Sequence, residues 1–138
     1  MIDMDERRKY PRYPIYCPIE YRSEDSEPVD RSITLNLCEG GALISTKRQL
    51  ERGAKLVIKI ALKGEIFFMR ATVVHVEFEE ANQVYNIGVE FQQNPFDFVS
   101  RFYDELEAIM LYQRLYSKET ARPISLAEAS LNWYNLPR

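Results

Sequence analysis

The sequence contains few of the residues from which most catalytic and metal sites are built. Its 138 residues include one histidine, His75, and two cysteines, Cys17 and Cys38, which lie too far apart for the paired spacing of a zinc site or redox motif. The short signatures of nucleotide-hydrolysing enzymes, metalloproteases and serine hydrolases are also missing. We therefore expect no enzymatic activity, no catalytic residue, no metal and no cofactor.

Long apolar runs and an excess of basic charge are missing as well. A membrane-spanning helix needs about 18 consecutive apolar residues, and no stretch of the sequence approaches that length. The charged N-terminus is not followed by an apolar run like that of a signal peptide. The 18 Lys and Arg against 21 Asp and Glu give a net charge of −3, which disfavours general binding to nucleic acid or anionic membranes. We expect a cytoplasmic protein with reduced cysteines, no nucleic-acid partner and no membrane insertion.

The composition that remains is that of a folded, mainly β domain. Hydrophobic residues make up 46% and charged residues 28%, as in ordinary globular chains. Short segments of alternating polarity, separated by turns such as 39–41 and 63–65, predict a six-stranded antiparallel barrel, which leaves no exposed sheet edge. Within the fifth segment we expect a bend. The strands are expected at 15–22, 31–37, 42–46, 55–62, 66–78 and 84–91.

Single residues in these strands have structural interpretations. Cys17 lies on the apolar face of the first strand and is expected to be a small core residue. His75 alternates with apolar neighbours and is interpreted as an ordinary polar-face or hydrogen-bonded histidine.

The composition shifts at Asn94-Pro95, where we place a boundary between a barrel domain (1–93) and a helical extension (94–138). Asn94 suits the N-cap of a helix and Pro95 its first position. Apolar residues then recur at steps of three and four as far as Ser117, which predicts a long amphipathic helix; they include Val99, Phe102, Leu106 and Ile109. The S-x-x-E spacing of residues 125–128 predicts a short second helix.

The apolar stripe of the long helix leaves two arrangements open. The helix can pack back on the barrel, which we favour slightly, or pair with a second copy as a short coiled coil. Gln113 would then lie in the seam of a homodimer, where a polar residue sets register. Apolar surface near Trp133 and Tyr134 could also receive a partner protein.

Two local motifs stand out from the rest of the chain. Residues 7–12, here called the strap, contain four basic residues in the order Arg7-Arg8-Lys9-Tyr10-Pro11-Arg12. Taken alone, this run is most often a solvated terminus. Residues 36–41, here called the glycine turn, follow a strand and end in Gly40-Gly41. Taken alone, this turn is a hairpin whose glycines supply positive φ.

Together, in this order, the strap and the glycine turn resemble the motifs of the PilZ family of cyclic di-GMP receptors. That family pairs an N-terminal R-x-x-x-R with a D/N-x-S-x-x-G turn on a six-stranded barrel. Arg8 and Arg12 match the first motif, with Arg7 as a further arginine; Asn36 and Gly41 match the second. Cys38 stands in the serine position. The resemblance covers roughly residues 6–91.

The resemblance implies a bacterial second-messenger receptor that binds cyclic di-GMP. A guanidinium can pair bidentately with phosphate or with guanine O6 and N7 and can stack on a base. An asparagine amide can bond a guanine edge, a glycine lets the backbone approach the base, and the residue before Pro11 favours an extended strap. The implied ligand-binding residues are Arg7, Arg8, Arg12, Asn36, Cys38, Gly40 and Gly41.

Cys38 is the one departure from the family pattern. A thiol is a weaker hydrogen-bonding group than a hydroxyl, so the loss of one neutral bond reduces binding by about 0.5–1.5 kcal/mol, or up to roughly tenfold. We therefore expect reduced affinity and tighter binding after Cys38→Ser.

The resemblance further implies that ligand draws the strap against the glycine turn, folds it there, and changes how the protein binds an unidentified effector protein in motility, biofilm, polysaccharide or virulence pathways. One alternative is a PilZ-like adaptor that binds partner proteins but no nucleotide. Another is a small nucleic-acid-binding barrel that stacks bases on Tyr10, Tyr13 and Tyr16, although the acidic net charge opposes it.

Overall fold

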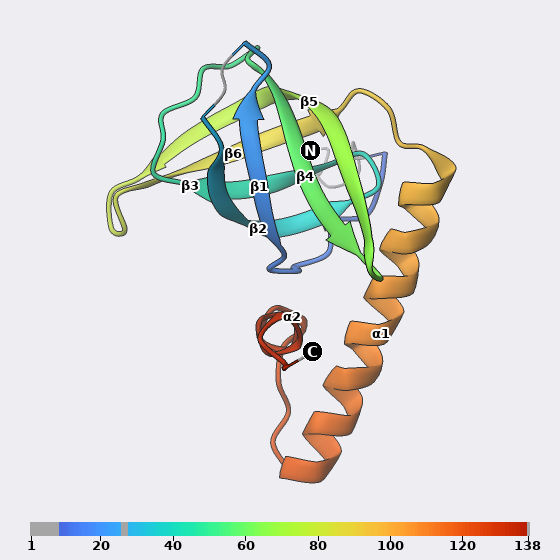
Figure 1. Cartoon of the computed structure of the whole chain (residues 1–138). Helices are drawn as coiled ribbons and strands as arrows, with labels where there is room; N and C mark the ends of the chain where they lie inside the picture. Colours follow the sequence, from blue (N-terminus) through green and yellow to red (C-terminus); the bar gives the residue numbers. More distant parts are fainter. Residues whose placement is uncertain (1–8, 26–27, 138) are drawn as a thin grey trace, which may run out of the picture.

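A closed antiparallel barrel of six strands followed by two helices forms the described structure, which is a computed structural model covering residues 9–25 and 28–137 (Figure 1). The strand order around the barrel is β1-β2-β3-β6-β5-β4. This architecture confirms the expected fold class. The strands are β1 (Pro18–Ser23), β2 (Asp30–Cys38), β3 (Gly41–Thr46), β4 (Lys55–Leu62), β5 (Glu65–Glu79) and β6 (Val84–Phe91).

Alternating side chains fill the interior of the barrel along strands such as β4. In β4 the inward side chains are all buried, whereas Lys59 on the other face pairs with Glu20 across the outer surface. Burial of each large apolar side chain contributes about 2 kcal/mol, which makes this alternation the main source of barrel stability. The buried residues of β4 are Leu56, Ile58, Ile60 and Leu62.

The expected bend in β5 is a β-bulge. The register of β5 against β6 shifts between Val73 and His75, so that Val73 faces the core while Val74 and His75 are exposed. A bulge inserts one residue and bends its strand, which allows a long strand to curve around a barrel.

Helix α1 (Phe96–Thr120) packs its first half on the barrel, as favoured from the sequence. The ring of Phe98 meets those of Phe67 and Phe91 edge to face, with centroids 5.5 and 5.4 Å apart. The expected N-cap at Asn94 is wrong: Pro95 holds that position and makes no side-chain cap bond. The buried stripe consists of Phe98, Phe102, Glu105, Leu106 and Ile109.

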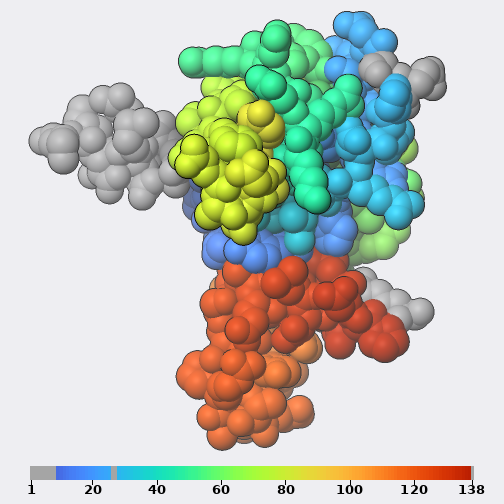
Figure 2. Space-filling model, turned by 90° about the vertical axis from the view of Figure 1, so that its left-hand side faces the viewer, coloured from blue at the N-terminus to red at the C-terminus, as the bar shows by residue number. Residues whose placement is uncertain are grey.

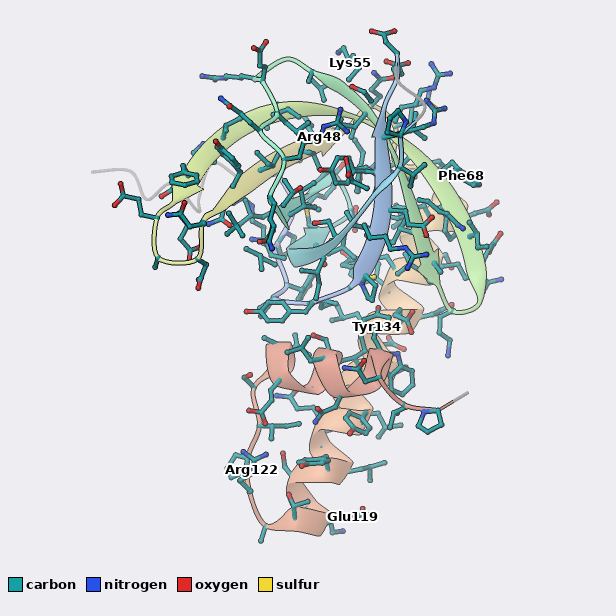
Figure 3. All side chains as sticks on the ribbon, turned by 60° about the vertical axis from the view of Figure 1, so that its left-hand side comes forward. Arg48, Lys55, Phe68, Glu119, Arg122 and Tyr134 are labelled. Atoms are coloured by element: carbon teal, nitrogen blue, oxygen red, sulfur yellow. The ribbon has the colours of Figure 1, made fainter. Side chains whose placement is uncertain are left out.

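Helix α2 (Leu126–Tyr134) lies beneath the barrel, beside the second half of α1, and the two helices form a lobe at one end of the barrel (Figures 1 and 2). The expected capping interaction is present, since the Ser125 hydroxyl accepts a hydrogen bond from the Glu128 backbone at 3.0 Å. The buried Ser130 hydroxyl accepts a bond from the Tyr16 N–H at 2.9 Å, which fastens α2 to the segment before β1. Figure 3 shows Tyr134 at the junction between α2 and the barrel.

The connection between α1 and α2 is held by Gln113, which would lie in the seam of the alternative coiled-coil dimer. The Gln113 side chain donates to the Ile124 carbonyl at 2.9 Å, and the Ser117 hydroxyl accepts from the Ile124 N–H at 3.4 Å. Gln113 therefore fixes the link within one chain, and a homodimer through this helix stays a prediction. In the described ranges, neither helix is long and apolar enough to cross a membrane.

Candidate functional site

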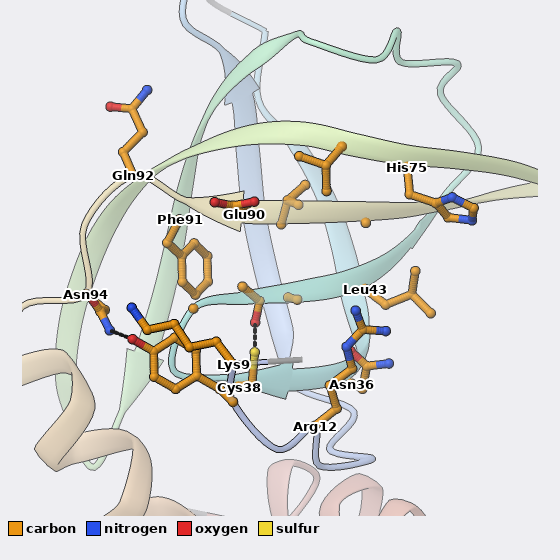
Figure 4. Close-up of a pocket in the computed structure, with 17 residues that line it drawn as sticks. Lys9, Arg12, Asn36, Cys38, Leu43, His75, Glu90, Phe91, Gln92 and Asn94 are labelled. Carbon is orange, nitrogen blue, oxygen red and sulfur yellow. Dashed lines mark hydrogen bonds between the residues drawn. The ribbon is translucent and has the colours of Figure 1, made fainter. Parts of the chain in front are cut away.

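An open pocket of about 760 Å³ lies on the outer surface of the barrel, between the strap, the glycine turn and strands β5 and β6 (Figure 4). The strap and β2 form one side, and the β5 bulge forms the other. Its lining residues are Lys9, Tyr10, Arg12, Asn36, Cys38, Gly40, Gly41, Ala42, Leu43, Val74, His75, Gly88, Val89, Glu90, Phe91, Gln92 and Asn94.

The pocket brings together the two motifs found in the sequence. Arg12 of the strap lines it together with four members of the glycine turn, although the two segments are separated by β1 and the following loop. The four are Asn36, Cys38, Gly40 and Gly41. Arg7 and Arg8 lie outside the described residues, so their place in the site stays a prediction.

Backbone pairing with β2 holds the chain immediately after the strap. The Tyr13 N–H donates to the Leu37 carbonyl at 3.0 Å, and the Leu37 N–H donates back at 2.9 Å. Two residues farther on, Ile15 is fully buried. These contacts place Arg12 next to a chain segment that is already paired with β2. The expectation that ligand folds the strap against the glycine turn stays a prediction.

Close packing, and not positive φ, explains the glycines of the turn. Strands β2 and β3 form the expected hairpin across this turn, with Cys38 opposite Gly41. Among the described glycines, however, positive φ occurs at Gly53 and Gly64, so the positive φ expected at 40–41 is wrong. A Cβ atom at Gly40 would lie 2.8 Å from the Tyr10 ring, and one at Gly41 would lie 2.2 Å from the Val89 carbonyl oxygen. The strap and β6 therefore approach the turn as closely as its backbone allows.

Cys38 closes the turn from within. Its Sγ donates to the Gly41 carbonyl at 3.4 Å (Figure 4). The Gly40 carbonyl accepts a bond from the Phe91 N–H at 2.8 Å. The thiol is partly exposed and lines the pocket. It occupies the place where a serine hydroxyl could serve both the turn and a ligand.

The sequence interpretation missed the far wall of the pocket. His75 lies there with a 60% exposed side chain, and its Nε2 is 3.5 Å from a carboxylate oxygen of Glu77. Gly88 lies directly opposite, since a Cβ there would be 3.1 Å from the His75 Cβ. The bulge carries His75 and Val74 to this wall, and strict alternation along β5 gave no sign of it.

The electrostatics of the pocket suit an anion. Lys9 and Arg12 are its cationic lining residues and Glu90 is its carboxylate, so the described lining carries a net positive charge in an acidic chain. Arginine and exposed backbone groups beside glycine are typical of phosphate and purine recognition. In residues 9–25 and 28–137, no group of three or more His, Cys, Asp or Glu is arranged to hold a metal ion.

Comparison with known families agrees with this geometry. The sequence model of the PilZ domain family matches residues 6–102, a range that holds both motifs, all six strands and the first turns of α1. The chain belongs to the PilZ domain family. A search of curated protein sequences finds no match. The division of this PilZ protein at 93/94 stays a prediction.

Solved structures share the fold at low sequence identity. The inhibitor of motility MotI/DgrA from Bacillus subtilis superposes with a TM-score of 0.62 and 16% identity, over 76% of this chain and 52% of that one. MrkH of K. pneumonia, in complex with c-di-GMP, superposes with a TM-score of 0.60 and 17% identity, over 78% of this chain and 53% of that one. The PilZ domain of YcgR from Escherichia coli, solved with c-di-GMP, superposes with a TM-score of 0.55 and 15% identity, over 83% of this chain and 98% of that one. The chain thus spans about half the length of MotI and MrkH.

Proposed function

We propose that this PilZ protein is a cyclic di-GMP receptor that binds the nucleotide in the pocket between the strap and the glycine turn. The observation that carries the proposal is the meeting of Arg12 with Asn36, Cys38 and Gly41 in one pocket. Family membership supports it, as do the MrkH and YcgR structures, which contain c-di-GMP.

The chemistry of the pocket fits this ligand. Cyclic di-GMP has two phosphodiester charges and two guanines, and Lys9 and Arg12 offer cationic groups at the rim. The guanidinium of Arg12 can pair bidentately with a phosphate or a guanine edge, while the Asn36 amide offers both an acceptor and a donor. A volume of about 760 Å³ lies in the range of small-molecule sites. In this proposal Arg8 completes the motif, and Arg7, its neighbour in the sequence, is a further ligand-binding arginine.

Binding would act through a partner protein and not through catalysis. Ligand shifts a conformational equilibrium only by its different affinity for the two states. The two states would differ in how the strap lies against the glycine turn when ligand is bound between them. The partner would be an effector protein that recognises the altered surface.

Isothermal titration with cyclic di-GMP, GTP and cyclic GMP tests the proposal. Selective binding at micromolar or lower Kd is expected, and Arg12→Ala should abolish it. Arg31→Ala is the matched control, since Arg31 is a surface arginine with an 89% exposed side chain that pairs with Glu20 outside the pocket. Equal losses in both variants, or no binding by the unaltered protein, would contradict the proposal.

A second function, a PilZ-like adaptor that binds no nucleotide, is favoured by one observation. The thiol of Cys38 already bonds the Gly41 carbonyl and replaces the serine of the motif. An adaptor of this kind would show no heat of titration and no change in melting temperature at saturating cyclic di-GMP.

A further inference from the structure

Helix α1 contacts the glycine turn directly. The Tyr103 hydroxyl of α1 donates a hydrogen bond to the carboxylate of Glu39, which stands between Cys38 and Gly40. Cys38 and Gly40 line the pocket, whereas Glu39 is not among the lining residues. The bond to Glu39 raises the pKa of Tyr103, and burial and the charge of Glu39 act in the same direction. A ligand-binding turn is therefore held from behind by a helix.

The barrel core fixes the position of Tyr103. Its ring meets that of Phe102 edge to face with centroids 5.0 Å apart, and Phe102 is 1% exposed. The ring of Phe102 also lies 5.9 Å from that of Tyr13, the residue that follows the strap. The same turn of α1 therefore contacts the glycine turn and the residue that follows the strap.

The strap has its own attachment to the start of α1. The Tyr10 hydroxyl accepts a bond from the Asn94 side chain at 3.1 Å, and Asn94 lies in the link between β6 and α1 (Figure 4). The Tyr10 ring packs on Gly40, where it leaves no space for a Cβ atom. Tyr10 is one of the variable positions of the arginine motif, so pattern matching assigns it no role.

Resting on the proposed function, we propose that α1 is a positioning element of the nucleotide site: Tyr103 holds the glycine turn through Glu39, and Asn94 holds the strap through Tyr10. Nucleotide binding and the order of α1 are then coupled. Coupling between two sites is reciprocal. If a contact increases the affinity for the nucleotide by some factor, the bound nucleotide increases the equilibrium constant for forming that contact by the same factor. The positioning residues in this proposal are Glu39, Tyr103 and Asn94, because the geometry of the pocket depends on them. Glu39 and Tyr103 do not themselves contact the ligand.

The coupling continues from α1 to α2. The buried Glu105, two residues after Tyr103, accepts a bond from the Trp133 indole N–H at 3.0 Å. A change in the order of α1 would therefore reach α2 and the lobe that the two helices form.

Titration of the full chain with cyclic di-GMP tests the positioning role. Tyr103→Phe keeps the ring and removes the hydroxyl, and we expect it to weaken binding by about three- to tenfold. Tyr112→Phe is the matched control on the same helix. It should bind within about twofold of the unaltered protein. Equal affinity of Tyr103→Phe and Tyr112→Phe would overturn the proposal.

Hydrogen exchange tests the coupling separately, because the slowing of exchange by ligand is compared within each protein and does not depend only on that protein's stability. Cyclic di-GMP should slow exchange of the backbone amides at residues 98–106 in the unaltered protein, and this effect should be reduced in Tyr103→Phe. Asn94→Ala, on an exposed residue, gives a second variant should Tyr103→Phe fail to fold. Ligand protection of residues 98–106 that is the same in unaltered, Asn94→Ala and Tyr103→Phe proteins would contradict the coupling.

The test also separates the positioning role from the proposed function. If the unaltered protein binds no cyclic di-GMP, the receptor proposal fails. The positioning role is then tested by the rate of hydrogen exchange at the backbone amides of the glycine turn, measured without ligand. Faster exchange at residues 38–42 in Tyr103→Phe than in Tyr112→Phe would then support it. Equal exchange would overturn it.

Discussion

Gly41 lies so close to Val89 that a Cβ atom on Gly41 would be 2.2 Å from the Val89 carbonyl oxygen. The contact belongs to the β3–β6 pairing, in which Gly41 opposes Glu90 and Ala42 opposes Val89. Real Cβ contacts do not become this short, so any side chain at residue 41 forces the two backbones apart. One residue of the ligand motif is therefore also required to close the barrel.

Gly41→Ala should reduce the free energy of unfolding by about 3 kcal/mol, because the opposing group is backbone and cannot rotate away. Gly40→Ala is the control. There the neighbour is the Tyr10 ring, which can move, so the fold should lose less stability. Urea unfolding followed by circular dichroism measures both. Equal losses in the two variants would show that the β3–β6 backbones can adjust.

Local sequence signals predicted the elements well wherever the interacting residues are neighbours in the chain. The turn at Lys63-Gly64 has positive φ at both residues, 50° and 79°, as a two-residue hairpin needs. The capping box of α2 is equally local. Asn94 fails as an N-cap because its side chain bonds Tyr10, which is 84 positions away in the sequence. A local rule cannot detect such a competitor.

The candidate site shows the same division. The resemblance of the two motifs to the PilZ pattern implied that Arg12, Asn36 and Cys38 share one site, and the structure places them in one pocket. The opposite wall depends on the β5 bulge, which shifts the register between Val73 and His75. A bulge leaves no fixed signature in an alternating sequence, because one extra residue changes the face of all that follow.

The buried carboxylate of Glu105 links α1 to α2 and to the turn between β4 and β5. Removal of one of its hydrogen-bond donors should lower the free energy of unfolding. The carboxylate accepts bonds from the Trp133 indole at 3.0 Å and from the Lys63 backbone at 3.1 Å. Trp133→Phe keeps an aromatic ring but leaves one carboxylate oxygen without this donor, which should cost about 1–3 kcal/mol in the free energy of unfolding.

A double-mutant cycle measures this bond. Trp133→Phe is made in the unaltered chain and in a Glu105→Leu background, and urea unfolding gives the four stabilities. The cost of Trp133→Phe should be smaller in the background that has no carboxylate. The same cost in both would show that packing of the indole, and not its hydrogen bond, stabilises α2.

Burial of Cys17 makes the fold sensitive to alkaline pH. Burial raises the pKa of its thiol from 9.0 to about 12; the hydrogen bond from Tyr134 lowers it, and the charge of Glu105 raises it. Above pH 9 the unfolded chain loses this proton while the folded chain keeps it. Stability is therefore complete below pH 9 and falls up to about pH 12, by at most about 1.4 kcal/mol for each pH unit.

Urea unfolding under reducing conditions at pH 8, 9 and 10 checks the effect of Cys17. Tyr21, whose pKa is also raised by burial, contributes in the same direction, so Cys17→Ala is needed as a control. The variant should be less stable at pH 8 and should lose less stability between pH 8 and pH 10. Parallel pH profiles for the two proteins would assign the alkaline loss to other groups.

Cys38→Ser should tighten the binding of cyclic di-GMP. The Cys38 thiol lines the pocket and donates to the Gly41 carbonyl at 3.4 Å. A serine hydroxyl at the same place can donate that bond and still accept one from the ligand, since it has one donor and two acceptor positions. One additional neutral hydrogen bond is worth about 0.5–1.5 kcal/mol, which corresponds to a Kd lower by up to about tenfold. The gain should appear in isothermal titration.

Cys38→Ala separates the hydroxyl effect from a steric effect of removing sulfur. Alanine provides the smaller side chain without a polar group, so it should leave the Kd unchanged or raise it. Tighter binding by both variants would mean that the sulfur obstructs the ligand. An unchanged Kd in Cys38→Ser would mean that residue 38 closes the turn through Gly41 and makes no contact with the nucleotide, and Arg12 and Asn36 would then provide the polar recognition on this side of the pocket.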